Sequence, residues 1–310
     1  MMGLAIFLPA LCFPGASGAS EALTTNQLAD SLSVIDVDTM KSIAEIKIGG
    51  KPAGSALSPD KTLAFLTAPD GQELVEVDIK ARSVTRRLNL GGGPLGIAAH
   101  PSKPEVYVAD WYAHKIVVVD TTAWTVTAEI PVGKSPSGLA VTPDGTLLLS
   151  ADRDSDQVSI IELATRKVIG TIAVGQRPFG VTIDAAGKTA YTANVASDDV
   201  SIIDIAARKV SGTVKVGHRP YAVALAGGRA FVTDQGIGTI TVFDLASLKV
   251  EKTIEACDHP EGIEVDATGA TIYAACWGDN LLLKIDTKTL QILGKASTGN
   301  GPRAFGKFLP

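Results

Sequence analysis

The chain has 310 residues, 45% of them hydrophobic, and a net charge of −5 at pH 7. This charge argues against a nucleic-acid-binding domain, for which a basic surface is expected, and no run of like charges suggests a disordered arm. The 31 glycines and 16 prolines are typical of a turn-rich β protein with a sizeable core. One closed all-β domain of this length is common, so we expect a single domain.

The first twenty residues contain no charged side chain. An apolar stretch from Leu4 to Phe13 is followed by small residues, which is the layout of a secretory signal peptide with cleavage near Ala19–Glu21, although the usual positively charged start is missing. The stretch is too short for a membrane-spanning helix, which needs about 20 apolar residues. We therefore expect a cleaved signal peptide over 1–20, a mature protein over 21–310 without a membrane span, and a periplasmic or secreted localisation.

Seven prolines divide the rest of the chain at a nearly fixed interval, and each closes a short Gly-containing turn and opens an apolar strand. They are Pro52, Pro94, Pro136, Pro178, Pro220, Pro260 and Pro302, separated by steps of 42, 42, 42, 42, 40 and 42 residues. A period of about forty residues with strand-type composition is typical of propeller blades. We therefore predict an all-β fold, a seven-bladed β-propeller of four-stranded antiparallel blades.

Residues 178–216 illustrate one repeat. The segment PFGVTID alternates Phe179, Val181 and Ile183 on one face, as a half-buried strand does. Three more strands are predicted in TAYTAN, DVSIIDIA and ARKVSGTVKV. Asp204 ends the third strand, where its side chain can bond the backbone ahead of it and set the next turn. The equivalent positions are Asp36, Asp78, Asp120, Glu162, Asp244 and Asp286.

The two ends of the chain complete the last blade. Only one strand remains after Pro302, and residues 23–36 align without a gap with residues 191–204. We therefore predict that the last blade combines one C-terminal strand with the first three N-terminal strands. Such a closure joins the ring by hydrogen bonds and removes two open sheet edges.

The second strands of the repeats share a short motif. They read LTTN, FLTA, YVAD, LSAD, YTAN, FVTD and YAAC, and together with VGxxP and VxVID they resemble the YVTN family of β-propeller repeat proteins. The resemblance covers the whole mature chain and implies an exported propeller scaffold. Relatives by fold include lactonase-like enzymes, haem d1-binding domains and large subunits of quinoprotein dehydrogenases.

The residues beside each repeat proline are expected to line the mouth of the central channel. From the fourth blade to the seventh they become large or charged, which marks a candidate ligand site. These residues are Arg177, Phe179, His218, Arg219, Tyr221, His259, Glu261 and Arg303. Arginine forks bind carboxylate or phosphate, so the sharper hypothesis is a small anionic ligand. The alternative is that these are ordinary exposed side chains paired with acidic neighbours.

Two tryptophans, Trp111 and Trp277, lie in loops on the same rim. An exposed aromatic beside a polar residue is typical of recognition surfaces, but a tryptophan at a strand end more often covers the adjacent blade. We predict the covering role for both.

Two cysteines remain in the mature chain. Cys257 replaces a repeat glycine and Cys276 replaces the Asn or Asp that ends the second strand of a blade. In an oxidising compartment an even count favours a disulfide, which would close a loop of roughly 20 residues and stabilise the fold by about 3 kcal/mol. We rank the disulfide above a metal site with Asp258 and His259, and above free thiols.

Motifs of enzyme chemistry are scarce, since CxxCH, GxSxG and HExxH do not occur. We expect a monomeric binding or interaction scaffold with no cofactor and no metal, whose partner is a small anionic ligand or a periplasmic protein. The first alternative is a lactonase-like hydrolase or lyase, with His218 or His259 as the base and Arg219 holding an acid group. The second is an accessory propeller subunit of a periplasmic quinoprotein or cytochrome redox system.

Overall fold

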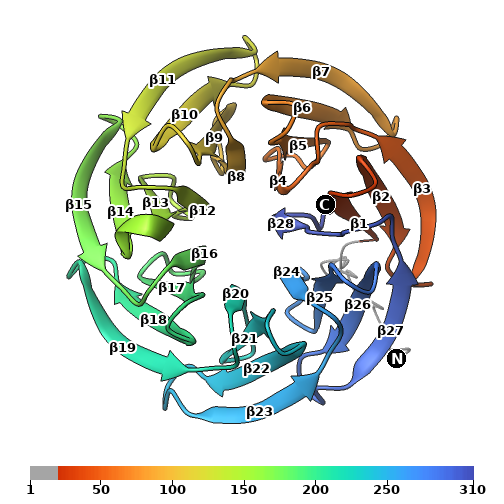
Figure 1. The fold of residues 1–310 in the computed structure, drawn as a ribbon, viewed down its shortest axis with the longest axis vertical. Coiled ribbons are helices and arrows are strands. Elements are labelled where there is room, and N and C mark those ends of the chain that lie inside the picture. The colour runs from red at the N-terminus through yellow and green to blue at the C-terminus, as the bar shows by residue number, and fades with distance from the viewer. Residues whose placement is uncertain (1–19) are drawn as a thin grey trace, which may run out of the picture.

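Seven blades of β-strands surround a central axis (Figure 1). The structure is a computed structural model that describes residues 20–310. The predicted signal peptide, apart from its last residue, lies outside the described residues. The predicted all-β seven-bladed propeller is confirmed. Within residues 20–310, no helix is long and apolar enough to cross a membrane.

In each blade the strands follow one another from the axis to the outer edge of the ring. The innermost strands are β4 (Gly54–Leu57), β8 (Pro94–Ala99), β12 (Pro136–Val141), β16 (Pro178–Ile183), β20 (Pro220–Ala226), β24 (Pro260–Val265) and β28 (Phe305–Gly306). The second strands are β1 (Glu21–Asn26), β5 (Leu63–Ala68), β9 (Glu105–Asp110), β13 (Leu147–Asp152), β17 (Thr189–Asn194), β21 (Arg229–Asp234) and β25 (Thr271–Cys276).

The outer half of each blade is equally regular. The third strands are β2 (Ser31–Asp36), β6 (Glu73–Asp78), β10 (Lys115–Asp120), β14 (Gln157–Glu162), β18 (Asp199–Asp204), β22 (Thr239–Asp244) and β26 (Leu281–Asp286). The outer strands are β3 (Lys41–Lys47), β7 (Ser83–Asn89), β11 (Thr125–Pro131), β15 (Lys167–Ala173), β19 (Lys209–Lys215), β23 (Val250–Glu255) and β27 (Ile292–Ser297). A 3₁₀ turn, η1 (Arg153–Ser155), follows β13.

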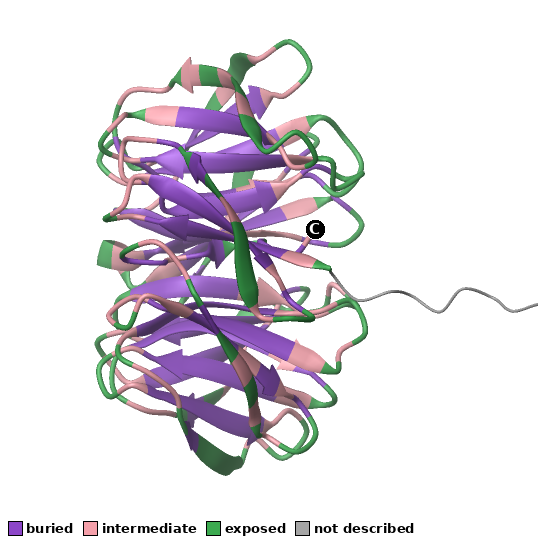
Figure 2. Cartoon of the chain, turned by 90° about the vertical axis from the view of Figure 1, so that its right-hand side faces the viewer, coloured by how far each residue is buried: buried purple, intermediate pink, exposed green. Residues whose placement is uncertain are grey.

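The second and third strands form the core. In β13 five of six residues are buried, whereas only one of seven is buried in the outer strand β15. Apolar side chains fill the space between neighbouring blades, as where Tyr107 of β9 packs in one cluster with Leu148 of β13. Figure 2 shows the result, with buried strands inside the disc and exposed residues on the two rims and the outer edge.

The acidic residues that end the third strands hold the turns predicted for them. Asp36 Oδ1 accepts hydrogen bonds from the backbone N–H groups of Asp38 and Thr39, and Asp244 accepts one from Ser247. These bonds stabilise the charged carboxylate and hold the pKa of Asp36 and Asp244 below its usual value. The repeated aspartate is therefore structural.

The C-terminal segment closes the ring. The Arg303 N–H donates to Thr25 O at 2.8 Å and the Leu23 N–H donates to Phe308 O at 2.8 Å, so this segment lies along β1 as predicted. The two-residue strand β28 also pairs in parallel with β4 of the next blade, with Phe305 opposite Gly54. The predicted closure is thus confirmed, and the parallel contact with β4 adds a link that the sequence analysis did not predict.

The innermost strands approach one another closely around the axis. A Cβ atom at Gly180 would lie 2.6 Å from the carbonyl oxygen of Tyr221 in the next blade, so glycine is needed there. The register between innermost and second strands also shifts just after the proline, as between Pro178 and Val181. Such a bulge re-aims side chains, and the residue after the proline lines a channel pocket in four blades: Leu95, Phe179, Tyr221 and Arg303.

Candidate functional site

Three aromatic rings lie across the channel. The ring centroid of Phe179 is 4.5 Å from that of Tyr221 and 5.0 Å from that of Phe305, and the last two are 5.5 Å apart. Phe179 and Tyr221 line a pocket on one side, and Phe305 lines a pocket on the other. The rings therefore divide the channel into two separate mouths.

We call the first pocket the arginine mouth. It has a volume of about 360 Å³, within the size range of small-molecule sites. Its lining combines three arginines, four aromatic residues and five other side chains or glycines. These are Arg153, Arg219, Arg303, Trp111, Tyr112, Phe179, Tyr221, Pro69, Gly93, Leu95, Val195 and Gln235.

The turn before each repeat proline positions Arg219. Its backbone is left-handed, with φ of 54°, and its N–H donates to Asp198 Oδ1 at 2.9 Å. Arg177 has the same conformation one blade earlier, with φ of 54° and an N–H bond to Asp156 at 2.7 Å. Both side chains are exposed, but only Arg219 lines the arginine mouth.

A buried charged group lies at the base of this mouth. Glu261 is 1% exposed, accepts a hydrogen bond from Gln235 Nε2 at 2.7 Å, and lies 3.4 Å from Arg303 Nε. The Arg303 guanidinium also donates to the Tyr221 hydroxyl at 3.4 Å. Burial raises the pKa of Glu261 and Arg303 opposes this shift, while burial raises the pKa of Tyr221. The base of the mouth thus holds an ion pair and a neutral phenol.

The outer wall is aromatic. The Trp111 ring lies 6.3 Å from the Phe179 ring, and the Arg153 guanidinium lies 5.4 Å from the Trp111 ring centroid, in range of a cation–π contact. Tyr112 is 74% exposed. A Cβ atom at Gly93 would lie 2.6 Å from the Tyr112 ring, so glycine lets this ring rest against the backbone.

Five of the eight predicted site residues gather here. Phe179, Arg219, Tyr221 and Arg303 line the arginine mouth, and Glu261 lies beneath it. Arg177, His218 and His259 are not part of the lining. The His218 Nδ1 atom lies 3.2 Å from the Asp198 carboxylate, and the His259 Nδ1 atom lies 2.5 Å from Asp258, both at the exposed surface.

Eight of the twelve lining residues were not among the predicted site residues. Gly93 and Leu95 flank a repeat proline, and the other six follow the end of a second strand, in the loops that share this rim: Pro69, Trp111, Tyr112, Arg153, Val195 and Gln235. Their shared position after a second strand was the sequence signal that could have found them. Trp111 also packs against the core as predicted, so one side of its ring is covered while the residue contributes to the pocket wall.

The histidines of the other loops have structural bonds. His114 Nδ1 accepts the Ser135 N–H at 3.1 Å, in the turn before Pro136. His100 is buried near the opposite rim, and its Nδ1 accepts the N–H groups of Ser102 and Lys103. Burial lowers the pKa of His100. Over residues 20–310, no group of three or more metal-ligating side chains is found.

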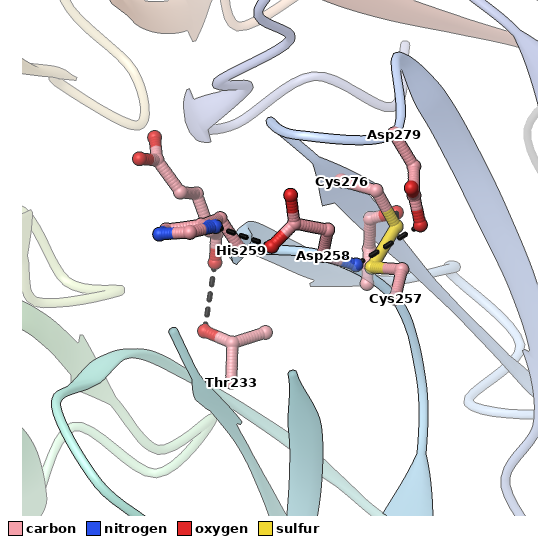
Figure 3. Close-up of a disulfide and its surroundings, with 8 residues drawn as sticks. Thr233, Cys257, Asp258, His259, Cys276 and Asp279 are labelled. Carbon is pink, nitrogen blue, oxygen red and sulfur yellow. Dashed lines mark hydrogen bonds and ion pairs between the residues drawn. A yellow bond between two sulfur atoms is a disulfide. The ribbon is translucent and has the colours of Figure 1, made fainter. Parts of the chain in front are cut away.

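The predicted disulfide is confirmed (Figure 3). Cys257 and Cys276 are bonded, with their Cα atoms 5.9 Å apart. In two other blades the equivalent positions are joined by a hydrogen bond from a glycine N–H to an aspartate. Gly133 donates to Asp152 and Gly217 donates to Asp234, each at 3.0 Å. The disulfide thus replaces a repeated turn-holding bond by a covalent one.

The strands around the disulfide have changed with it. In the fifth blade, Asp234 accepts hydrogen bonds from the hydroxyls of Thr239 and Thr241 on the adjacent strand. The corresponding residues in the disulfide blade are Leu281 and Leu283, which are apolar. The disulfide blade therefore has a covalent bond and apolar side chains at the positions where the fifth blade has an aspartate and two threonine hydroxyls.

These features define a closed propeller with one cationic and aromatic channel mouth. The family described as YNCE-like beta-propeller matches residues 146–306, more than half of the chain. The protein belongs to this YNCE-like β-propeller family. The YVTN-type assignment, made from the second-strand motifs, stays a prediction.

Solved structures share the fold. The chain is similar to Kuenenia stuttgartiensis hydrazine synthase, with a TM-score of 0.79 and 20% identity over 88% of this chain and 93% of that chain. It is similar to a protein of unknown function from Desulfotomaculum acetoxidans DSM 771, with a TM-score of 0.78 and 15% identity over 93% of this chain and 100% of that chain.

A third similar structure is the dihydro-heme d1 dehydrogenase NirN in complex with DHE. Its TM-score is 0.69, at 14% identity over 95% of this chain and 76% of that chain. At these identities the likeness shows the fold alone. A search of curated proteins found no match.

Proposed function

We propose that the protein binds a small anionic ligand, a carboxylate or a phosphate, at the arginine mouth. The observation that carries this proposal is the lining itself. It brings together Arg153, Arg219 and Arg303 and, over residues 20–310, contains no Asp or Glu. Arginine presents a planar fork of donors that matches carboxylate and phosphate oxygens.

Arg219 is the residue that we expect to meet the ligand charge. Arg153 is paired with Asp154 at 2.7 Å, and Arg303 lies 3.4 Å from Glu261. Within the described part of the chain, Arg219 has no ion pair. Its side chain is exposed and lines the same pocket as the aromatic residues, so its charge can attract an anion from solvent.

The propeller repeat offers a matched control for this proposal. In calorimetric titrations with benzoate, acetate and inorganic phosphate, the native protein should bind at least one anion. Arg219→Ala should lose about 10- to 100-fold in affinity, since a charge-assisted hydrogen bond is removed. Arg177→Ala removes an arginine from the equivalent turn and should bind as the native protein does. Absence of binding to every anion would overturn the proposal.

We also infer that the protein acts outside the cytoplasm, as a binding scaffold. Two features support this: the signal-like first twenty residues and a disulfide, which persists in oxidising compartments. Fractionation of native cells tests this inference. Protein in the periplasm or medium with both cysteines resistant to alkylation is the expected result, and a cytoplasmic, fully alkylated protein is the contrary one.

A role as accessory propeller in a redox system is a second candidate. It rests only on the fold shared with hydrazine synthase and a dihydro-heme d1 dehydrogenase. A visible absorption band in protein purified from its native host would support it, and a colourless protein would count against it. The lactonase-like alternative is less well supported, because His218 and His259 pair with aspartates away from the lining.

A further inference from the structure

Aromatic residues are concentrated at the arginine mouth. They make up 5% of the chain, yet four of the twelve lining residues are aromatic: Trp111, Tyr112, Phe179 and Tyr221. Binding an inorganic anion requires donors and charge, and it does not require four rings. The rings therefore indicate a second component of the ligand besides its negative charge.

The four rings are divided between a fixed floor and an accessible wall. Phe179 and Tyr221 are buried and pack on each other at 4.5 Å, so they form a rigid surface. Trp111 is half-buried, and Tyr112 is 74% exposed and rests against Gly93. A pocket bounded by a rigid aromatic floor and an aromatic wall favours a flat molecule, because rings stack in offset or edge-to-face arrangements.

The cations lie beside these rings. The Arg153 guanidinium is held 5.4 Å from the Trp111 ring centroid, and Arg303 donates to the Tyr221 hydroxyl. Arg219 lines the same pocket without an ion pair among residues 20–310. A ligand that stacks on the rings and carries a negative charge at its edge would bring that charge close to these cations. The volume of about 360 Å³ has room for one ring or a fused pair of rings.

We propose that the ligand is an aromatic carboxylate, a planar ring that bears a carboxylate directly. This inference rests on the proposed function. The ring packs against Tyr112 and the Phe179–Tyr221 floor, beside Trp111, and the carboxylate pairs with Arg219. No covalent step is involved.

Three probes of similar size separate the two components of this ligand. Calorimetry on the native, full-length mature protein compares benzoate, cyclohexanecarboxylate and benzamide. Benzoate should bind about tenfold more tightly than cyclohexanecarboxylate, which is equally apolar but not planar. Benzamide, which keeps the ring and lacks the charge, should bind at least about tenfold more weakly than benzoate.

The possible failures are distinguishable. Equal affinity for benzoate and cyclohexanecarboxylate would overturn the aromatic assignment and leave anion binding intact. Binding of benzamide as tightly as benzoate would overturn the charge requirement. No binding of either acid would overturn the aromatic carboxylate, and the proposed function fails as well if acetate and inorganic phosphate do not bind either.

Tyr112 provides the matched variants, because it is exposed and its replacement should not affect folding. Tyr112→Leu should abolish the preference for benzoate over cyclohexanecarboxylate, whereas Tyr112→Phe should keep it. Circular dichroism verifies that both variants are folded. A preference that persists in Tyr112→Leu would show that the Tyr112 ring does not contact the ring of the ligand, and the proposal would fail.

Discussion

The two mouths of the channel are built from the same seven innermost strands, yet they differ sharply. At the arginine mouth, the residue after each proline varies: Ala53, Leu95, Ser137, Phe179, Tyr221, Glu261 and Arg303. At the opposite end, the residue three positions further along is small in most blades: Ala56, Ala98, Ala140, Thr182, Ala224, Glu264 and Gly306. We call this second pocket, of about 640 Å³, the alanine mouth.

The two exceptions at the alanine mouth have structural explanations. Thr182 Oγ1 donates to the carbonyl oxygen of Val223 in the next blade at 2.6 Å. Glu264 accepts the backbone N–H groups of Phe308 and Leu309, so it holds the C-terminal segment in place. Four of the varied residues, Leu95, Phe179, Tyr221 and Arg303, line the arginine mouth. Repeat proteins diversify on the face that binds, so the comparison supports the ligand site proposed there.

The largest expected effect is the loss of stability on removing the disulfide, which lies on the same rim as the arginine mouth. Replacing both cysteines, Cys257→Ala with Cys276→Ala, should lower the free energy of unfolding by about 3 kcal/mol, because the unfolded chain is no longer cross-linked. Urea unfolding measures this change. Native protein kept in reductant should match the double variant. A loss below about 1 kcal/mol would mean that the disulfide contributes little to the rim.

The next effect is a pH dependence at the same rim. Burial raises the pKa of Asp234 from 3.8 to about 6. Because the folded protein holds this proton more tightly than the unfolded chain, its contribution is favourable below about pH 4 and is lost as pH rises through 6. Asn194 occupies the equivalent position in the preceding blade. We therefore expect Asp234→Asn to be about 3 kcal/mol more stable than the native protein at pH 8.

Urea unfolding at pH 4, 6 and 8 measures this difference. The stabilisation by Asp234→Asn should be largest at pH 8 and nearly absent at pH 4. The opposite order, with the variant relatively weaker at pH 8, would contradict a raised pKa at this buried carboxyl.

A smaller effect is expected from the wall of the arginine mouth. Gly93→Ala would place a methyl group against the Tyr112 ring and displace it. Benzoate affinity should then fall about threefold with little change in stability, since Tyr112 is largely exposed. Unchanged affinity would show that the position of this ring is unimportant for binding.

The smallest effect should come from the alanine mouth. Ala98→Val adds bulk to the pocket on the other side of the three rings. It should leave benzoate affinity within about twofold of the native value. A larger loss of affinity would mean that the two mouths are coupled and cannot be compared as independent sites.

The fold could be predicted almost completely, because the spacing of the prolines depends only on local turns and strand lengths. The closure by the C-terminal segment followed from the same counting. The parallel pairing of Phe305 with Gly54 did not, because it depends on how closely innermost strands approach. The disulfide was predictable because Cys257 and Cys276 replace two residues that lie together in other blades, as Gly133 and Asp152 do.

The site was only partly predictable. Phe179 and Tyr221 follow their prolines, and the repeated bulge turns that position inward. Arg177 and Arg219 are equivalent in sequence and in backbone, yet only Arg219 lines the pocket. Repeat symmetry cannot distinguish them, because the difference arises from neighbouring side chains. Arg153 comes from the one loop that forms a 3₁₀ turn, which has no counterpart in the other blades described.

The most direct test of the account is where a bound aromatic acid lies. Crystals of the mature protein soaked in 4-bromobenzoate would reveal the bromine by its anomalous scattering. The account predicts one strong site between Tyr112 and Phe179, with the carboxylate within hydrogen-bonding distance of the Arg219 guanidinium. Bromine in the alanine mouth, or the absence of any ordered site at saturating concentration, would contradict it.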